Sequence, residues 1–313
     1  MTSFTAGSPS GGQSSAQEGE RPSGLRPLQG SGLQAGVLYL VATPIGNLED
    51  ITLRALRTLR EVDAIAAEDT RVTLKLLSRY GISKPLFSYH RHSKPGALRK
   101  ILSLLREGKN VALVCDAGTP GISDPGEEVV QACVREGLQV AAIPGPSALI
   151  SALSVAGLPT SGFIFTGFLP RRASERRTVI SELARVRKTL VFFEAPHRLL
   201  ACLKDMIQVL GDRQAAAARE LTKKFEEIIR GPLSNIIKHF EATRPRGEVV
   251  IMVAGAEQPT PRGDESPGAR ISDALAMARS LRASGRSTRS AAMEAAEDSG
   301  LPWRQIYRAL LSE

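Results

Sequence analysis

The stretch from Asn110 to Gly126, NVALVCDAGTPGISDPG, constrains the fold of this chain more than any other. Its first part, Val111 to Cys115, is uncharged and apolar, which predicts a buried strand. The following eleven residues, 116–126, contain three Gly and two Pro, which exclude a continuing helix or strand. A plain turn needs only about four residues. Because open α/β sheets bind ligands at the carboxyl ends of their strands, we predict a ligand-binding loop here rather than a simple chain reversal.

Two further junctions of the same kind flank this loop along the chain. Residues 36–42 form an apolar run that leads into TPIGN, and residues 138–143 form another that stops at PGPS. A segment with helical spacing of apolar residues follows each run. Such alternation predicts a mostly parallel sheet with helices on both faces. The pattern breaks at 157–162, GLPTSG, where we place a domain boundary.

The second half of the chain predicts a second α/β domain and a helical end. Strands are expected at 189–193, 215–218 and 248–254, and a basic helix at 173–187. Three short helices follow, at 272–281, 288–298 and 302–311. The last two, around a Gly turn, suggest a helix-turn-helix-like module. A small packing or docking domain fits these helices equally well, because the net charge from Pro259 onward is only about +1, with eight Arg against seven acidic residues.

These observations divide the chain into five parts. The amino-terminal part is rich in Gly, Ser, Pro and Gln and cannot bury a core, so we predict that it is disordered. The parts are a disordered tail at 1–35, α/β domains at 36–158 and 159–257, a linker at 258–269, and a helical module at 270–313.

The positive charge of the chain is concentrated locally. The net charge is +9, and the segments 171–188 and 91–109 each carry a net charge of +5. Two basic patches on a folded body suggest a polyanion as partner, with nucleic acid as the obvious candidate. Ordinary solvated helix faces explain the same charges equally well.

Cysteine usage and hydropathy indicate the compartment. The three cysteines, Cys115, Cys133 and Cys202, lie far apart, which argues against disulfides and against a zinc site. No metal site is expected. No apolar window is long enough to span a membrane, and no signal peptide is visible. We therefore expect a cytoplasmic protein that does not enter a membrane.

Eight motifs together resemble those of a known family. They are, in order, VATPIGNLEDITLRAL, EDTR, VCDAGTPGISDPG, IPGPSA, FTGFLPR, FFEAPHR, ARELTKKFEE and GEVVIMVAG. The chain from Gly36 to about Ala256 resembles the tetrapyrrole-methylase superfamily, and within it the ribosomal RNA small subunit methyltransferase I family. The superfamily in general has GxGPG in its first loop, whereas this branch has TPIGN, as here.

The resemblance implies a fold, a cofactor and a substrate. It implies a two-domain α/β fold with S-adenosylmethionine (SAM) in the cleft between the domains, and a homodimer. The implied activity is 2′-O-methylation of a cytidine ribose in the decoding region of 16S rRNA, in the small ribosomal subunit. The residues that match cofactor-facing positions are Ile45, Gly118, Thr119, Ile122, Ser147, Ala148 and Phe193.

A ribose hydroxyl is a weak acid, so a base should accept its proton during transfer. Candidates at strand ends are Asp69, Glu194, His197 and Lys223, of which we favour Glu194 or Asp69. Asp69 could instead cap a helix, Glu194 could pair with Arg198, and Lys223 could contact phosphate. The candidates for contact with the RNA backbone are Arg71, Arg171, Arg172, Arg198, Lys223 and Lys224.

Three other functions remain open at this stage. A C-methyltransferase of a tetrapyrrole precursor would keep the fold and the cofactor, but it should show GxGPG and needs no basic helix. A catalytically silent ribosome-binding protein would bind rRNA without SAM. A nucleotide-dependent oxidoreductase is disfavoured because the GxGxxG fingerprint is missing.

Overall fold

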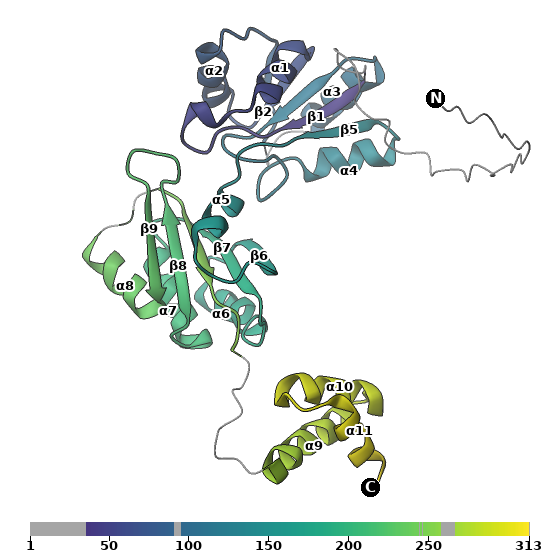
Figure 1. Ribbon diagram of the computed structural model, residues 1–313. Coiled ribbons are helices and arrows are strands. Elements are labelled where there is room, and N and C mark those ends of the chain that lie inside the picture. Colours follow the sequence, from purple (N-terminus) through teal and green to yellow (C-terminus); the bar gives the residue numbers. More distant parts are fainter. Residues whose placement is uncertain (1–35, 91–94, 244, 246, 258–266, 313) are drawn as a thin grey trace, which may run out of the picture.

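A computed structural model describes residues 36–90, 95–243, 245, 247–257 and 267–312. Figure 1 shows two α/β domains followed by a bundle of three helices. The predicted tail at 1–35 and most of the predicted linker lie outside the described residues. No helix in the described part of the chain is long and apolar enough to cross a membrane.

The first domain is a parallel sheet covered on both faces. Its five strands have the order β3-β2-β4-β1-β5, and all neighbours are parallel. The strands are β1 (Val37–Val41), β2 (Ala64–Ala67), β3 (Leu86–Ser88), β4 (Val111–Val114) and β5 (Gln139–Ile143). β4 is buried along its whole length, as its uncharged sequence predicts. The parallel sheet expected from the alternating pattern is confirmed.

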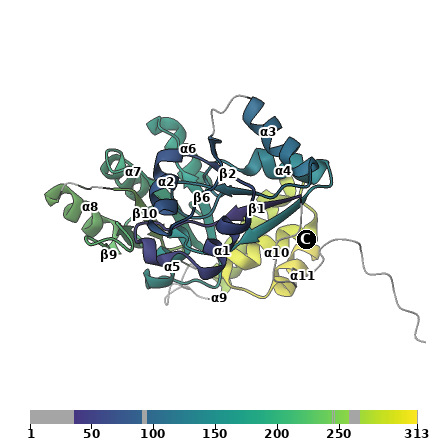
Figure 2. The ribbon, with the colours of Figure 1, turned by 90° about the horizontal axis from the view of Figure 1, so that it is seen from above.

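Four helices cover this sheet, two on each face. Leu59 of α1 (Leu53–Glu61) and Leu77 of α2 (Thr70–Arg79) enter one core cluster. Ile101 of α3 (Pro95–Arg106) and Val129 of α4 (Glu127–Arg135) enter the cluster on the other face. Figure 2 shows α3 and α4 together on one side of the sheet. A short 3₁₀ helix, η1 (Leu48–Asp50), lies between β1 and α1.

The second domain contains a mixed five-stranded sheet of order β6-β7-β10-β8-β9. Only β6 and β7 are parallel; the other neighbours run antiparallel. The strands are β6 (Phe163–Phe168), β7 (Thr189–Glu194), β8 (Gln214–Arg219), β9 (Glu227–Pro232) and β10 (Val249–Val253). β9 was not predicted from the sequence.

Helices cover the two faces of the second sheet unequally. α6 (Ala173–Glu182), α7 (Leu199–Leu210) and α8 (Leu233–Ala242) build the larger core on one face. α5 (Ala148–Val155) packs on the other face, through Ala152 and Leu153. α7 and α8 were not predicted, and α6 ends at Glu182 rather than at residue 187 as predicted.

The helical module has a core of its own. It consists of α9 (Pro267–Ala283), α10 (Thr288–Ser299) and α11 (Trp303–Leu311). Small residues such as Ala278, Ala291 and Ala295 let the helices approach closely, and Ile306 and Leu310 of α11 close the core. α9 begins five residues before the predicted helix at 272–281.

Candidate functional site

The loops that follow β1, β4 and β5 are joined at their bases. Thr43 and Gly118 exchange two backbone hydrogen bonds, of 2.9 and 3.0 Å between nitrogen and oxygen. This pairing requires the left-handed conformation of Gly118, φ +83°, which favours glycine. The Thr119 hydroxyl donates a hydrogen bond to the Pro146 carbonyl at 3.5 Å. Three strand ends of the first sheet therefore form one continuous rim.

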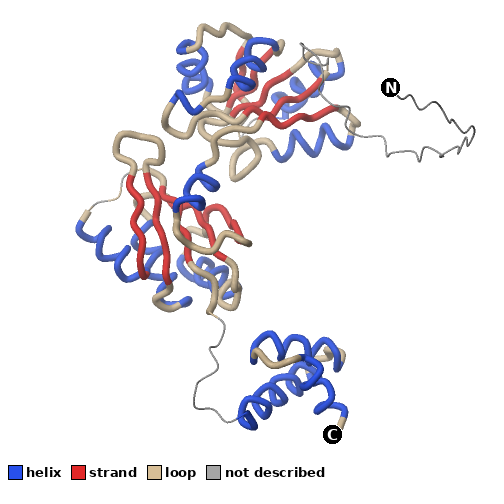
Figure 3. Tube along the Cα trace, viewed as in Figure 1, coloured by secondary structure: helices blue, strands red, loops and turns tan. Residues whose placement is uncertain are grey.

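Loops of the second domain lie directly against this rim. A Cβ atom at Gly46 would lie 2.5 Å from Cγ of Lys223 and 2.9 Å from the Leu221 carbonyl oxygen, so the backbones meet there without room for a side chain. A Cβ atom at Gly167 would lie 2.9 Å from Oγ of Ser123. Figure 3 shows the loops of both sheets gathered between the two domains.

A cavity of about 700 Å³ lies where these loops meet, which is the size expected of a small-molecule site. One part of its wall is apolar, one part carries backbone and hydroxyl groups, and one part carries carboxylates. The lining residues are Ile45, Glu68, Asp116, Ala117, Gly118, Thr119, Ile122, Ser123, Asp124, Ser147, Ala148, Leu149, Ile150, Phe168, Phe193, Glu220, Leu221, Lys223, Gly247, Glu248, Val249 and Val250.

The cavity brings together all seven residues that the sequence singled out for the cofactor. They come from the loops after β1 and β4, the start of α5, and the end of β7. Ser147 caps α5, because its side chain accepts the backbone N–H of Ile150 at 3.5 Å. The amino-terminal end of α5 therefore faces the cavity with its partial positive charge.

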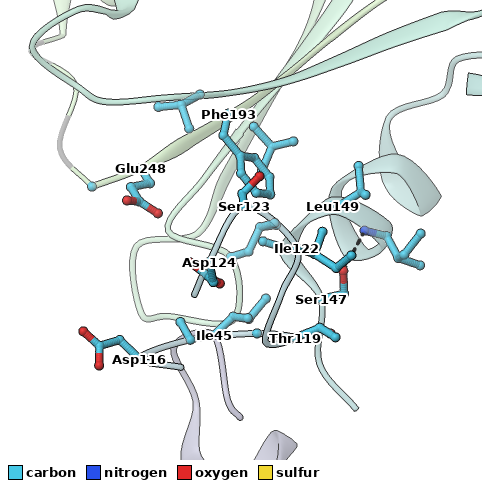
Figure 4. Close-up of a pocket in the computed structure, with 18 of the residues that line it drawn as sticks. Ile45, Asp116, Thr119, Ile122, Ser123, Asp124, Ser147, Leu149, Phe193 and Glu248 are labelled. Carbon is cyan, nitrogen blue, oxygen red and sulfur yellow. Dashed lines mark hydrogen bonds between the residues drawn. The ribbon is translucent and has the colours of Figure 1, made fainter. Parts of the chain in front are cut away.

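Five acidic residues also line the cavity: Glu68, Asp116, Asp124, Glu220 and Glu248. Figure 4 shows Asp116, Asp124 and Glu248 on the side of the pocket away from Ser147 and Thr119. Burial raises the pKa of Asp124 to about 6, and the negative charge of Glu68 adds to the effect. Two of the five acids stand in the loop 116–126, whose length was the sequence signal for a site.

Glu194 does not reach this cavity. Successive side chains of β7 point to opposite faces of the sheet, so Phe193 faces the α5 side and Phe192 and Glu194 face the α7 side. The Glu194 side chain is fully buried and lies 3.2 Å from Arg198 Nη2. The geometry corrects our preference for Glu194 as a base in favour of the structural pair with Arg198.

Asp69 is the N-cap of α2, so the alternative that we left open for it describes the structure. Its carboxylate accepts the backbone N–H of Arg71 at 2.8 Å and lies 2.6 Å from Arg71 Nη2. These hydrogen bonds lower the pKa of Asp69 to about 2, which makes it a weak base. Asp69 adjoins the lining residue Asp116, whose carboxylate accepts the Asp69 backbone N–H, but it does not line the cavity itself.

The six residues predicted to contact RNA lie in different environments. Arg71, Arg171 and Arg172 are exposed, although Arg71 pairs with Asp69 and Arg172 with Glu175. Lys224 is exposed, and Lys223 lines the cavity, paired with Glu220 at 2.9 Å.

Arg198 serves the fold instead of facing solvent. Its guanidinium donates to the carbonyls of Leu169 and Pro170 at 2.7 and 3.1 Å, and its side chain is 16% exposed. Our prediction that Arg198 contacts RNA is therefore not supported by its position.

Comparisons with known proteins agree with this architecture. The family model of the tetrapyrrole (corrin/porphyrin) methylases matches residues 37–237. Among solved structures, a cobalt precorrin-4 methyltransferase of cobalamin biosynthesis superposes with a TM-score of 0.55 at 20% identity, over 70% of this chain and 95% of that chain. Diphthine synthase gives a TM-score of 0.56 at 17% identity, over 70% and 90%. These similarities confirm the fold.

Curated relatives are more similar in sequence. A protein of Thermotoga maritima named ribosomal RNA small subunit methyltransferase I is 52% identical over 222 residues, which is 71% of this chain and all of that protein. A protein of Synechocystis sp. with the same name is 47% identical over 277 residues, 88% of this chain and 98% of that protein. The chain therefore belongs to the tetrapyrrole (corrin/porphyrin) methylase family, and within it to the ribosomal RNA small subunit methyltransferase I family.

Proposed function

We propose that this protein is a SAM-dependent methyltransferase that methylates the ribose 2′-hydroxyl of a cytidine in the decoding region of 16S rRNA. The observation that carries the proposal is the cavity of about 700 Å³ between the domains, in a chain 52% identical to a protein named for methylation of small-subunit rRNA. The substrate is assigned from the family, and the cavity supplies a place for donor and acceptor to meet.

The wall of the cavity suits the parts of SAM. Ile45, Ile122 and Phe193 offer apolar surface to an adenine ring. The amino-terminal end of α5 and the backbone near Thr119 offer N–H groups to a carboxylate. The carboxylates on the opposite side suit an ammonium group or ribose hydroxyls. When bound, SAM supplies a methyl group on a positively charged sulfur, so we propose no metal.

The residues of the chain would then perform three tasks. They align the acceptor hydroxyl with the methyl group, because a near-attack geometry removes much of the entropic barrier. They exclude water from the transfer. They also accept the hydroxyl proton as the new bond forms.

The acceptor would approach from the side of the β8–β9 loop and the start of α6. Lys223 and Lys224 lie in the β8–β9 loop, next to Phe225, which is 69% exposed. Lys224 Nζ lies 5.7 Å from the centroid of the Phe225 ring. Arg171 and Arg172 stand three and four residues after the lining residue Phe168. Exposed cations beside an exposed ring are suited to phosphates and to an unstacked base. From the family resemblance, we propose 16S rRNA of the small ribosomal subunit as partner and a homodimer as the active form.

The proposal is tested by methyl transfer from labelled SAM to small ribosomal subunits purified from cells that lack the native modification. Alkaline hydrolysis then distinguishes the products, because a 2′-O-methyl group protects the adjacent phosphodiester bond from cleavage. One protected cytidine in the decoding region is the expected result. Label on a base, or no label on rRNA although SAM binds, would reject the assigned acceptor. Transfer to a tetrapyrrole precursor instead would support the C-methyltransferase.

A further inference from the structure

We propose that Arg230 is a positioning residue for SAM, which acts through the helix α5. Arg230 lies on β9 and holds the carboxyl end of α5, whereas the amino end of this helix lines the cavity. The inference rests on the SAM binding proposed above. It adds a residue that lies outside both the sequence motifs and the described lining of the cavity.

The first turn of α5 forms part of the cavity wall. Ser147, Ala148, Leu149 and Ile150 are consecutive in the chain, and all four line the cavity. The proposed function assigns the carboxylate of SAM to this end of the helix, where backbone N–H groups are free to donate. A shift or tilt of α5 therefore changes a part of the wall that binds the donor.

The packing of α5 alone fixes its position weakly. The helix follows β5 of the first sheet, but it packs on the second sheet. Of its eight residues, Ala152 and Leu153 are buried, and the alanine offers little side chain to interlock with its neighbours. A helix of this length is not stable without tertiary contacts. The position of α5 therefore depends on what holds its ends.

Arg230 holds the carboxyl end of α5 through its guanidinium. Its Nε and Nη2 atoms both donate to the carbonyl oxygen of Val155, at 3.0 and 2.6 Å. Val155 is the last residue of α5, where carbonyl groups lack partners within the helix and the helix carries a partial negative charge. The guanidinium therefore both satisfies this carbonyl and is attracted by the helix dipole.

The strand register directs Arg230 toward α5. Arg230 lies opposite Ala216 in the β8–β9 pair, and Ala216 belongs to the core cluster on which α5 packs. Ile228, two residues earlier on β9, packs against the same cluster, whereas Ile229 packs against the cluster on the other face. The Arg230 side chain therefore leaves the sheet on the face that carries α5.

This arrangement predicts an effect on SAM affinity rather than on global stability. With α5 already held in place, SAM does not have to order the helix when it binds. Val155 and Arg230 are both exposed, so water can replace the lost hydrogen bonds when the guanidinium is removed. The midpoint of urea unfolding should therefore stay close to that of the wild type.

An exposed arginine could instead contact the RNA backbone. A phosphate contact requires positive charge, whereas two hydrogen bonds to one carbonyl require the fixed fork of a guanidinium. Arg230→Lys separates the two roles, because lysine keeps the charge but supplies a point donor on a flexible stem.

The first test is calorimetric titration of SAM into the wild type, Arg230→Ala and Arg230→Lys. The Kd of SAM should rise about three- to tenfold in Arg230→Ala, and Arg230→Lys should recover only part of the affinity. In methyl transfer, the KM for SAM should rise by a similar factor. At saturating SAM, kcat should stay within about twofold of the wild type, because the filled cavity is the same.

Arg60→Ala is the matched control. Arg60 is also exposed and donates at 3.3 Å to the carbonyl of Tyr80, the residue that ends α2. The described residues that line the cavity include none of α2. This variant should therefore bind SAM as the wild type does.

Hydrogen exchange tests the hold on α5 without an acceptor. The Ser151 N–H donates to the Ser147 carbonyl at 2.9 Å in the first turn of α5. This amide should exchange faster in Arg230→Ala than in the wild type, and saturating SAM should restore its protection. The amides of β10, in the middle of the second sheet, should exchange equally in both proteins.

Two results would overturn the inference: a Kd of SAM in Arg230→Ala within about twofold of the wild type, or unchanged exchange in α5. Weaker binding to the small subunit with unchanged SAM affinity would assign Arg230 to the RNA instead. Failure of the proposed function looks different. A wild type that binds SAM but methylates no ribose rejects only the acceptor, and a wild type that binds no SAM rejects both proposals.

Discussion

Asp205 of α7 holds two arginines of α6 against the second domain. Its carboxylate lies 2.5 Å from Arg176 Nη2 and 3.1 Å from Arg177 Nη1. The side chains of Asp205 and Arg176 are only 10% and 6% exposed, whereas Arg177 is 42% exposed. One of the cations that make 171–188 basic, Arg176, is therefore used inside the protein.

Removing this carboxylate should be costly. Asp205→Ala would leave the buried Arg176 charge without its ion-pair partner, and we expect a loss of about 3–5 kcal/mol in the free energy of unfolding. Arg177→Ala is the matched control, since it removes an exposed partner and should cost about 0–1 kcal/mol. Urea unfolding at pH 7 measures both. Equal losses in the two variants would contradict the view that burial makes this pair important.

Single residues also show how far the sequence predicts the site. Thr119 and Ser147 were assigned to the cofactor through the family resemblance, and the structure places both where strands of one parallel sheet end at the cavity. Glu194 misled the prediction because the face of the strand on which it lies depends on register, which spacing from the strand end does not fix. Asp124 was visible as an acid in the loop, but its raised pKa arises mainly from burial in the folded protein and then from the charge of Glu68, which is distant in sequence.

At the scale of elements, the loop before α6 carries two exposed arginines of the basic segment. Arg171 and Arg172 are exposed, in a loop whose preceding carbonyls are held by Arg198. This loop follows β6, whose last residue, Phe168, lines the cavity. The arginines are therefore placed to contact a polyanion beside the cavity.

Charge reversal tests this placement. Arg171→Glu with Arg172→Glu should weaken binding to the small subunit and flatten the dependence of log Kd on log salt concentration, because fewer counterions are released. The matched control is Lys204→Glu with Lys238→Glu, two exposed lysines of α7 and α8 that do not line the cavity. Filter binding at several salt concentrations measures both. Identical slopes for the two double variants would remove the start of α6 from the interface.

The elements missed from the sequence have physical reasons. β9 ends in Gly231 and Pro232, two residue types that disfavour strands and so hide it in the sequence. The structure tolerates Pro232 because β9 is an edge strand. α7 does show helical spacing of buried residues, at Leu199, Leu203, Met206 and Leu210, so its periodicity was a usable signal. The apolar strands β4 and β10 were predictable because burial on both faces requires an uninterrupted apolar run.

At the scale of the whole molecule, the helical module is separable from the α/β body. Its core consists only of residues of α9, α10 and α11. The Thermotoga maritima relative is matched over its whole length by 222 residues of this chain, fewer than the 277 matched by the Synechocystis relative. The family fold therefore does not require every part of this chain.

The single tryptophan, Trp303, makes this separation measurable. Its fluorescence reports only on the module, whereas far-UV circular dichroism is dominated by the α/β body. We expect the two signals to give different urea midpoints, because the parts unfold independently. A chain ending at Glu257 should keep the dichroism midpoint of the full chain. Coincident midpoints in the full chain, together with a lower dichroism midpoint in the truncated chain, would show that the module stabilises the body.

The central claim is that the cavity between the two sheets binds the methyl donor. Calorimetric titration of SAM into the wild type and into Ala148→Trp tests it most directly, because Ala148 lines the cavity at the first position of α5. Ala173→Trp is the control, since Ala173 is exposed at the first position of α6. We predict that Ala148→Trp abolishes SAM binding while its circular dichroism stays unchanged, and that Ala173→Trp binds as the wild type does. Equal SAM affinity in all three proteins would contradict the placement of the donor in this cavity.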